Sequence, residues 1–108
     1  MNSRLCQSSY RDAHLFVHLQ QQVVMLDGET VSLNRLEYRL LALLVEHAGE
    51  VMPQSILFME IWGHGPEIRE DKVGTCIRRL RKKLGGYADR YIETVVGIGY
   101  RFRPMPGP

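Results

Sequence analysis

The fold is decided by residues 70–84, which read EDKVGTCIRRLRKKL. At about 100° per residue, the apolar and the basic side chains of this stretch fall on opposite faces of a helix. The apolar face carries Val73, Ile77, Leu80 and Leu84. The opposite face presents a small polar residue, Thr75, among five cations: Lys72, Arg78, Arg79, Lys82 and Lys83. The pattern predicts a helix that is anchored on one side and offers positive charge on the other.

The basic face lacks the acidic neighbours that a merely solvated helix normally has. Exposed helices often place Glu one turn before Lys or Arg, but no acid occurs from Ile77 to Leu84. A run of charge by itself is as often a solvated surface as a binding surface. The net charge is only +2, yet residues 1–67 hold four Lys/Arg and eight Asp/Glu, while residues 68–108 hold ten and four. We therefore expect the second part of the chain to hold an anionic partner.

Two further helices are expected before this one. Asn34 and Glu37 form a capping-box pattern, with Asn in place of Ser or Thr, and predict a helix that ends at Gly49. Its wide apolar stripe indicates burial on most sides: Leu36, Leu40, Leu41, Leu43, Leu44 and Val45. Pro53 opens the second helix, because proline is tolerated in a first turn, and this helix runs to about Trp62.

Short extended runs flank the helices. Three of them predict a small antiparallel sheet with a tight turn at Asp27-Gly28: residues 14–19, 23–26 and 30–33. Two more flank Gly97-Ile98-Gly99 and predict a hairpin: residues 91–96 and 100–103. A hairpin beside an exposed basic helix is the wing of a winged helix-turn-helix. The expected fold class is α+β, with an N-terminal antiparallel sheet, three helices and a C-terminal hairpin wing.

The chain is expected to form one domain with two short ends. Its 108 residues, of which 44% are apolar and 24% charged, suffice for one modest core. We expect the winged-helix domain over residues 13–103, a partly disordered N-terminal segment over 1–12 and a loose tail over 104–108. No stretch has the length of a membrane span and the start lacks the pattern of a signal peptide, so we expect a cytoplasmic location.

A basic helix of this kind fits the major groove of duplex DNA, which admits one α-helix and displays base edges. Arg78 and Arg79 can bond guanine through a planar fork, and Thr75 can touch a thymine methyl or a phosphate. The other cations of the helix are expected to neutralise the DNA backbone: Lys72, Arg81, Lys82 and Lys83. In the hairpin, backbone contacts are expected from Thr94, Tyr100, Arg101 and Arg103. At Tyr100 the pattern fits a place in the sheet core nearly as well as a contact with the DNA backbone. Phe102 is expected in the sheet core.

Residues 23–102 resemble the OmpR/PhoB-type effector domain of bacterial response regulators, the output half of two-component systems. The strongest matches are IRRLRKKL at 77–84 and IETVVGIGYRF at 92–102. Weaker matches keep the same spacing: LDG at 26–28, EYRLL at 37–41, AGEV at 48–51 and IWG at 61–63. The resemblance implies a four-stranded N-terminal sheet and binding of double-stranded promoter DNA at direct repeats by a head-to-tail dimer. It also implies contact of RNA polymerase with the loop before the third helix, here Trp62, Gly63, His64, Gly65, Pro66 and Glu67.

Several positions depart from the family pattern. Gly74 stands where relatives often carry Asp or Asn, and glycine weakens a helix by roughly 1 kcal/mol relative to Ala. It either admits close approach of the backbone to DNA or is simply tolerated. Val96 stands where an arginine commonly reaches into the minor groove, which valine cannot do, and Pro53 replaces a serine cap. Trp62 fits a half-buried core position as well as a contact. The missing receiver domain fits either an excised effector domain or a single-domain protein.

Two other function classes are weighed against DNA binding. A winged helix can also be a protein-docking module, which would not need the basic face, and salt dependence of binding separates the two. An enzyme is disfavoured because no nucleophile, phosphate-binding or metal-ligand motif is present and the histidines lie in different elements: His14, His18, His47 and His64. No cofactor or metal is expected, and Cys6 and Cys76 are expected to be free thiols.

Overall fold

The computed structural model describes residues 9–63 and 69–105. Four short strands come first: β1 (Ser9–Arg11), β2 (Leu15–His18), β3 (Val23–Leu26) and β4 (Glu29–Thr30). The helical part follows: α1 (Arg35–Glu46), β5 (Val51–Pro53), α2 (Gln54–Trp62) and α3 (Glu70–Leu84). The last elements are a 3₁₀ turn (Gly85–Tyr87), α4 (Ala88–Tyr91), β6 (Ile92–Val95) and β7 (Gly99–Phe102). The order confirms the predicted α+β winged-helix fold.

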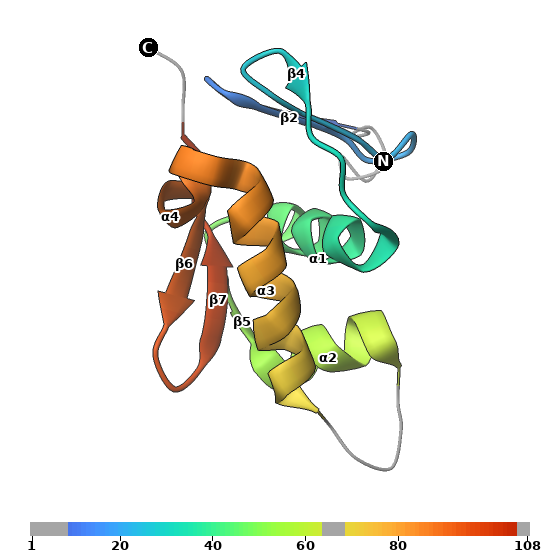
Figure 1. The fold of residues 1–108 in the computed structure, drawn as a ribbon. Helices are drawn as coiled ribbons and strands as arrows, with labels where there is room; N and C mark the ends of the chain where they lie inside the picture. The colour runs from blue at the N-terminus through green and yellow to red at the C-terminus, as the bar shows by residue number, and fades with distance from the viewer. Residues whose placement is uncertain (1–8, 64–68, 106–108) are drawn as a thin grey trace, which may run out of the picture.

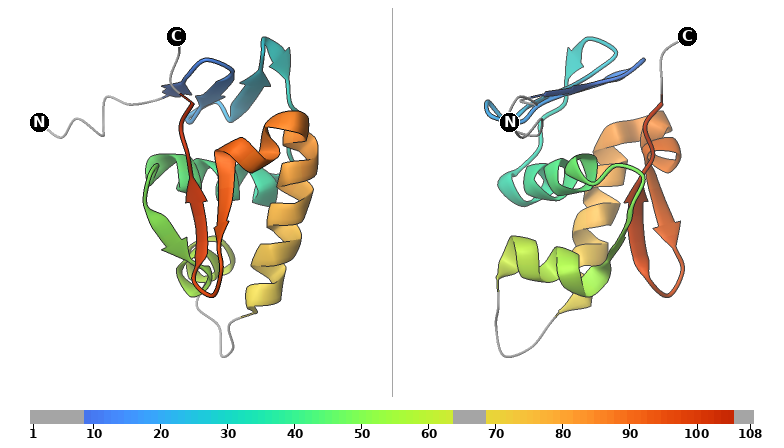
Figure 2. Two further views of the ribbon diagram at one scale, coloured as in Figure 1. Left: turned by 90° about the vertical axis from the view of Figure 1, so that its left-hand side faces the viewer. Right: turned by 180° about the vertical axis from the view of Figure 1, so that it is seen from behind.

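The N-terminal sheet is an antiparallel meander in the order β1-β2-β3-β4, and it lies as a layer over α1 and the C-terminal end of α3 (Figures 1 and 2). The predicted turn at Asp27 and Gly28 has positive φ angles of 51° and 83°, as tight turns between twisted strands require. Alternate residues of a strand face one side. The inward-facing residues that join the core are Leu15, Val17 and Val24.

α1 and α3 supply the centre of the hydrophobic core. The predicted capping box is present, because Asn34 Oδ1 accepts from the Glu37 N–H at 2.8 Å and Glu37 Oε1 accepts from the Asn34 N–H at 3.0 Å. The fully buried leucines of α1 are Leu40, Leu41 and Leu44. They belong to the same core as the apolar stripe predicted for α3: Val73, Ile77, Leu80 and Leu84. This packing fixes the rotation of α3 about its own axis.

A second antiparallel sheet, in the order β5-β7-β6, carries the predicted hairpin and runs beside α3 (Figures 1 and 2). Gly99 makes the pairing of β5 with β7 possible. A Cβ at Gly99 would lie 1.9 Å from the carbonyl oxygen of Met52, so no larger residue fits there. At the hairpin tip, Gly97 has a φ of 80°, which is also a glycine conformation.

The hydrophobic pattern placed neither β1, β5 nor α4, because segments of three or four residues are too short to show a period, and only the family resemblance implied a fourth N-terminal strand. The position predicted for Pro53 was also wrong. It is the last residue of β5 and the N-cap of α2, not the first helical residue. Its extended backbone pairs with Gly99 on an edge strand, where proline is tolerated.

One carboxylate, Asp12, ties distant parts of the chain together. It accepts hydrogen bonds from the hydroxyls of Tyr10 and Tyr91, the latter at 2.6 Å. Its other donors are the backbone N–H groups of His14, Leu15 and Met105. Burial raises the pKa of Asp12, but the donated hydrogen bonds outweigh burial, and the net pKa lies below the usual value. The carboxylate therefore stays ionised and holds β1, α4 and the segment after β7 in one network.

Ordered structure extends beyond the expected domain limits of 13 and 103. β1 pairs with β2, and the Ala13 N–H donates to the Met105 carbonyl at 3.2 Å. The sequence showed neither contact, because each joins a short segment to a partner far along the chain. Residues 1–8 and 106–108, which make up most of the two predicted ends, lie outside the described residues.

An ion pair between the buried Glu37 and the partly exposed Lys83 joins α1 to α3. Glu37 is the single buried charged side chain among residues 9–63 and 69–105. Lys83 Nζ donates to Glu37 Oε1 at 2.6 Å. Burial raises the pKa of Glu37, but the hydrogen bonds from Lys83 and from the Asn34 N–H outweigh it, so the net pKa is lowered. A buried carboxylate needs such a partner, because removing one member leaves an uncompensated charge.

Replacing Lys83 by Met should destabilise the domain by about 1–3 kcal/mol, because Glu37 then lacks its cation. A carboxyl whose pKa is lowered by folding stabilises the protein above its unfolded-state pKa, near 4.5 for Glu, and this contribution is lost as the pH falls through the lower folded-state pKa. The wild type should lose stability in that acidic range, and Lys83→Met should lose less. Thermal unfolding at neutral and acidic pH measures both effects. The exposed Lys82→Met is the matched control, and equal melting temperatures for the two variants would contradict the assignment.

Candidate nucleic-acid interface

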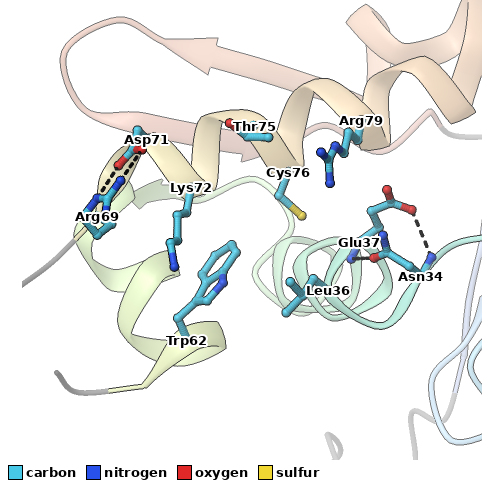
Figure 3. A pocket seen from close by; sticks show the side chains of 10 residues that line it. All are labelled: Asn34, Leu36, Glu37, Trp62, Arg69, Asp71, Lys72, Thr75, Cys76 and Arg79. Carbon is cyan, nitrogen blue, oxygen red and sulfur yellow. Dashed lines mark hydrogen bonds and ion pairs between the residues drawn. The ribbon is translucent and has the colours of Figure 1, made fainter.

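α3 exposes the face that the sequence predicted. Its apolar stripe is at most 1% exposed, whereas all five predicted cations are exposed: Lys72, Arg78, Arg79, Lys82 and Lys83. Thr75, at the centre of the predicted face, is half-buried. Its neighbour Cys76 is buried and points toward α1 (Figure 3). The exposed surface of α3 is therefore almost entirely basic beyond its first turn.

Four of the exposed cations of α3 have no acidic side chain at ion-pair distance among the described residues. No ion pair in the described ranges includes Lys72, Arg78, Arg79 or Lys82. Arg69 pairs with Asp71 at 3.1 Å where the helix starts, and Lys83 pairs with Glu37 near its other end. Like charges spaced over about three helical turns repel one another. A polyanion that binds along this face would relieve the repulsion.

Two cations predicted to face the DNA backbone instead bond to other groups of the protein. Lys83 pairs with Glu37, so its amino group is directed to α1 and away from the exposed face. Arg81 Nη2 donates to the Ile92 carbonyl at 2.8 Å and to Thr94 Oγ1 at 2.7 Å. A helical wheel gives the direction of a side chain from the helix axis but not the neighbours beside the helix. For this reason sequence reasoning missed both partners.

The hairpin offers fewer free polar groups than expected. Arg101 Nη2 pairs across the two strands with Glu93 at 2.9 Å, a partner that the sequence analysis did not single out, although opposed charges on paired strands are a usable signal. Tyr100 is only 8% exposed, which fits a core aromatic, and Phe102 is buried as predicted. Thr94 and Arg103 are exposed. They are the polar side chains of the predicted hairpin set that remain open to solvent without an acidic partner.

The tip of the hairpin is apolar. Val96 is 90% exposed and Ile98 is 52% exposed. Neither side chain can donate or accept a hydrogen bond, so the tip has no means of reading base edges. This agrees with the expectation that Val96 cannot make the minor-groove contact that an arginine makes at this position in relatives.

A hollow of about 260 Å³ lies beside α3, on the side of α1 and α2 (Figure 3). Its apolar lining comes from Leu36, Trp62 and Cys76, and its cations include Lys72 and Arg79. Burial raises the pKa of the Cys76 thiol to about 11, so this free cysteine stays protonated at neutral pH and is a poor nucleophile. The hollow extends the basic surface of α3 sideways. Cys6 lies outside the described residues.

The loop predicted to contact RNA polymerase is described only at its start. Trp62 is half-buried and stacks on Phe58, with ring centroids 5.4 Å apart and an interplanar angle of 12°. This packing fits the core interpretation of Trp62. Gly63 ends α2 with a φ of 92°. The other candidates lie outside the described residues: His64, Gly65, Pro66 and Glu67.

In the described part of the chain, no three or more His, Cys, Asp or Glu side chains are grouped so that they could hold a metal ion. No helix among those residues has the length and apolarity needed to cross a membrane.

Comparison with known proteins identifies the same domain type. Residues 28–102 match the family described as "Transcriptional regulatory protein, C terminal". The response regulator ArlR of Staphylococcus saprophyticus is 40% identical over 81 residues, which are 74% of this chain and 37% of that protein. The chain thus spans little more than a third of the length of the relatives that it matches. ArlR of Staphylococcus aureus shows the same identity and coverage.

Solved structures with the same fold include DNA-binding domains. DrrB, an OmpR/PhoB homologue from Thermotoga maritima, has a TM-score of 0.83 at 29% identity over 94% of this chain and 46% of that chain. The DNA-binding domain of RstA from Klebsiella pneumoniae, solved in complex with the RstA box, has a TM-score of 0.82 at 31% identity. That match covers 92% of this chain and all of the RstA domain.

The family match runs from the turn between β3 and β4 to the last strand, and α3 and the hairpin both lie within it. The chain therefore belongs to the C-terminal domains of OmpR/PhoB-type transcriptional regulators, and it is a DNA-binding effector domain rather than an enzyme.

Proposed function

We propose that this domain binds promoter DNA with α3 in the major groove and with the β6–β7 hairpin along the neighbouring backbone. The observation that carries the proposal is the row of four unpaired cations on the exposed side of α3. A helix that is fixed in rotation presents the same side chains at every approach to DNA. The hairpin runs beside α3 (Figures 1 and 2), so one duplex can meet both elements.

The cations of α3 divide between base reading and charge neutralisation. Arg78 and Arg79 read base edges, because a guanidinium offers two parallel donors to O6 and N7 of guanine. Lys72 and Lys82 neutralise phosphates and add affinity without sequence information. Thr75 lies half-buried between them and meets a base only at close approach. Lys83 fixes the position of α3 through Glu37 and adds little to the contact.

The hairpin contributes backbone contacts through Thr94 and Arg103. Arg101 is restrained by Glu93, and Tyr100 supports the strand from within the core. The tip residues Val96 and Ile98 have no hydrogen-bonding groups. Sequence discrimination therefore resides in α3, and the hairpin sets the register of the domain on the duplex.

The family also suggests how the domain works on a promoter. RstA was solved on its DNA box, and by analogy this domain binds double-stranded promoter DNA. We extend the analogy to direct repeats occupied by a head-to-tail dimer and to contact between RNA polymerase and the loop that starts at Trp62. In this role the chain is the output domain of a bacterial two-component system and acts in the cytoplasm.

The sequence analysis left a protein-docking module without DNA binding as the alternative function. The described surface does not favour this alternative. The exposed large apolar residues lie on three separate elements: Leu36, Ile56, Val96 and Ile98. Affinity for duplex DNA should fall linearly on a log–log plot against salt, with a slope of about −0.9 for each phosphate contact. An apolar docking surface would show no such dependence.

Arg79→Ala should weaken binding to the preferred duplex by about 1–3 kcal/mol and relax the sequence preference, because a base-reading fork is lost. Lys82→Ala should weaken binding to every sequence by about the same factor and make the salt slope shallower by about 1. The preferred duplex is found first by selecting genomic fragments with the purified domain. Fluorescence anisotropy with that duplex and a scrambled duplex then gives the affinities. The division of roles is wrong if Arg79→Ala weakens both duplexes by equal factors.

Gly74→Ala should stabilise the domain by about 1 kcal/mol, because alanine is the better helix former. A Cβ at position 74 would lie 3.8 Å from the Tyr100 hydroxyl oxygen, which is ordinary contact. That Cβ faces the hairpin rather than the exposed basic face, so DNA affinity should stay nearly unchanged. Thermal unfolding and DNA titration test the two parts. A clear loss of affinity in a stabilised variant would show that the glycine serves close approach to DNA.

A further inference from the structure

Arg81 occupies the junction between α3 and the hairpin. Its Nη2 donates to the Ile92 carbonyl at 2.8 Å and to Thr94 Oγ1 at 2.7 Å, and both acceptors belong to β6. Its guanidinium carbon lies 5.8 Å from the centroid of the Tyr100 ring in β7. A single side chain of α3 thus contacts both strands of the hairpin.

The Arg81 side chain is partly buried at this junction. Its Nε is the one buried side-chain nitrogen or oxygen without a hydrogen-bond partner in residues 9–63 and 69–105. Leaving a buried donor unpaired costs free energy. The fold keeps the arginine there nonetheless, with its Nη2 group directed into the hairpin and not toward solvent.

We propose that Arg81 is a positioning residue, which fixes the hairpin against α3 and orients the Thr94 hydroxyl to donate a hydrogen bond to a DNA phosphate. The inference rests on the proposed function and refines it. It replaces the expected direct contact between Arg81 and the DNA backbone.

The orientation of the Thr94 hydroxyl follows from the number of hydrogen bonds that it can donate and accept. A threonine hydroxyl has one hydrogen to donate and two lone pairs that accept. Arg81 occupies one lone pair, so the hydrogen is free to point outward, and Thr94 is exposed. A cationic donor on the oxygen polarises the hydroxyl and strengthens the bond that it donates. A phosphate oxygen, which only accepts, is the matching partner.

The positioning role follows from geometry. α3 and the hairpin must meet one duplex together, so the distance between them decides whether both contacts form. Arg81 sets this distance by joining the helix directly to the Ile92 carbonyl. Without the link, the hairpin retains its pairing within the sheet, but its placement relative to α3 is less restricted.

Five variants separate positioning from direct contact: Arg81→Gln, Thr94→Val, their double variant, Thr94→Ser, and Lys82→Gln as the matched exposed control. Affinity for the selected duplex is measured by anisotropy over a range of salt. Arg81→Gln and Thr94→Val should each weaken binding about fivefold, the worth of one hydrogen bond. The double variant should be no weaker than Arg81→Gln alone, because both changes remove the same contact. Thr94→Ser keeps the hydroxyl and should restore near wild-type affinity.

The salt slope supplies the decisive readout. Lys82→Gln should make the slope shallower by about 0.9, since a phosphate contact is lost. Arg81→Gln should leave the slope as in the wild type. A slope change in Arg81→Gln equal to that of Lys82→Gln would make Arg81 a phosphate ligand and overturn the proposal. Additive losses of affinity in the double variant would also overturn it. Additivity would mean that Arg81 and Thr94 act independently on DNA binding, as expected if Arg81 merely supports folding.

Hydrogen exchange without DNA tests the anchoring separately. The backbone amides of 92–95 should exchange faster in Arg81→Gln than in the wild type and unchanged in Lys82→Gln. Equal rates in all three proteins would overturn the anchoring role. If the wild type fails to bind any duplex at low salt, the proposed function and the donor role of Thr94 fall together, whereas the exchange rates still decide whether Arg81 anchors the hairpin.

Discussion

The burial of one apolar stripe on α3 is the constraint on which the rest of the structure depends. Because this stripe lies in the core formed with α1 and α2, α3 cannot rotate about its axis without exposing leucines to water, at roughly 1.5–3 kcal/mol for each large side chain. The side chains that face outward are therefore set by packing and not by the DNA. A reading surface gains specificity from such preorganisation, because no binding energy is spent on ordering the helix.

The same constraint explains how so much positive charge is tolerated on one helix. The cations that leave the exposed face are bonded inside the domain: Lys83 to Glu37 and Arg81 to β6. Each of them joins α3 to another element, and the helix is fixed from both flanks. The four cations that remain are solvated in the free domain, where their repulsion is weak and screened by salt. Counterions released on binding then favour the complex with DNA.

The sequence was informative wherever a pattern repeats over several turns or where turn chemistry is specific. The three long helices, the capping box at Asn34 and the tight turn at Asp27 are all local features, and all are present. Periodicity could not show β1 and β5, because each has only three residues and exists through pairing with a distant strand.

The candidate site was predictable in outline for the same reason. A helical wheel is enough to show which cations of α3 are exposed. The partners that remove Lys83 and Arg101 from the basic set are acids 46 and 8 residues away along the chain. Only the fold brings them together, and the same holds for the contact of Arg81 with Thr94. Proline is compatible with the end of an edge strand and with the start of a helix, and Pro53 lies where the two meet. From the sequence alone, the start of the helix was favoured.

The network at Asp12 has a consequence for how the domain unfolds. Its five donors come from the first strand, the segment that leads into β2, the end of α4 and the residues after β7. If the N-terminal sheet detached, this carboxylate would keep the donors of its own segment but lose those of Tyr91 and Met105, and the hydroxyl of Tyr91 would be left within the body. Melting of the sheet and melting of the helical body are therefore coupled. The small meander at the start of the chain thus shares the cooperativity of the whole domain.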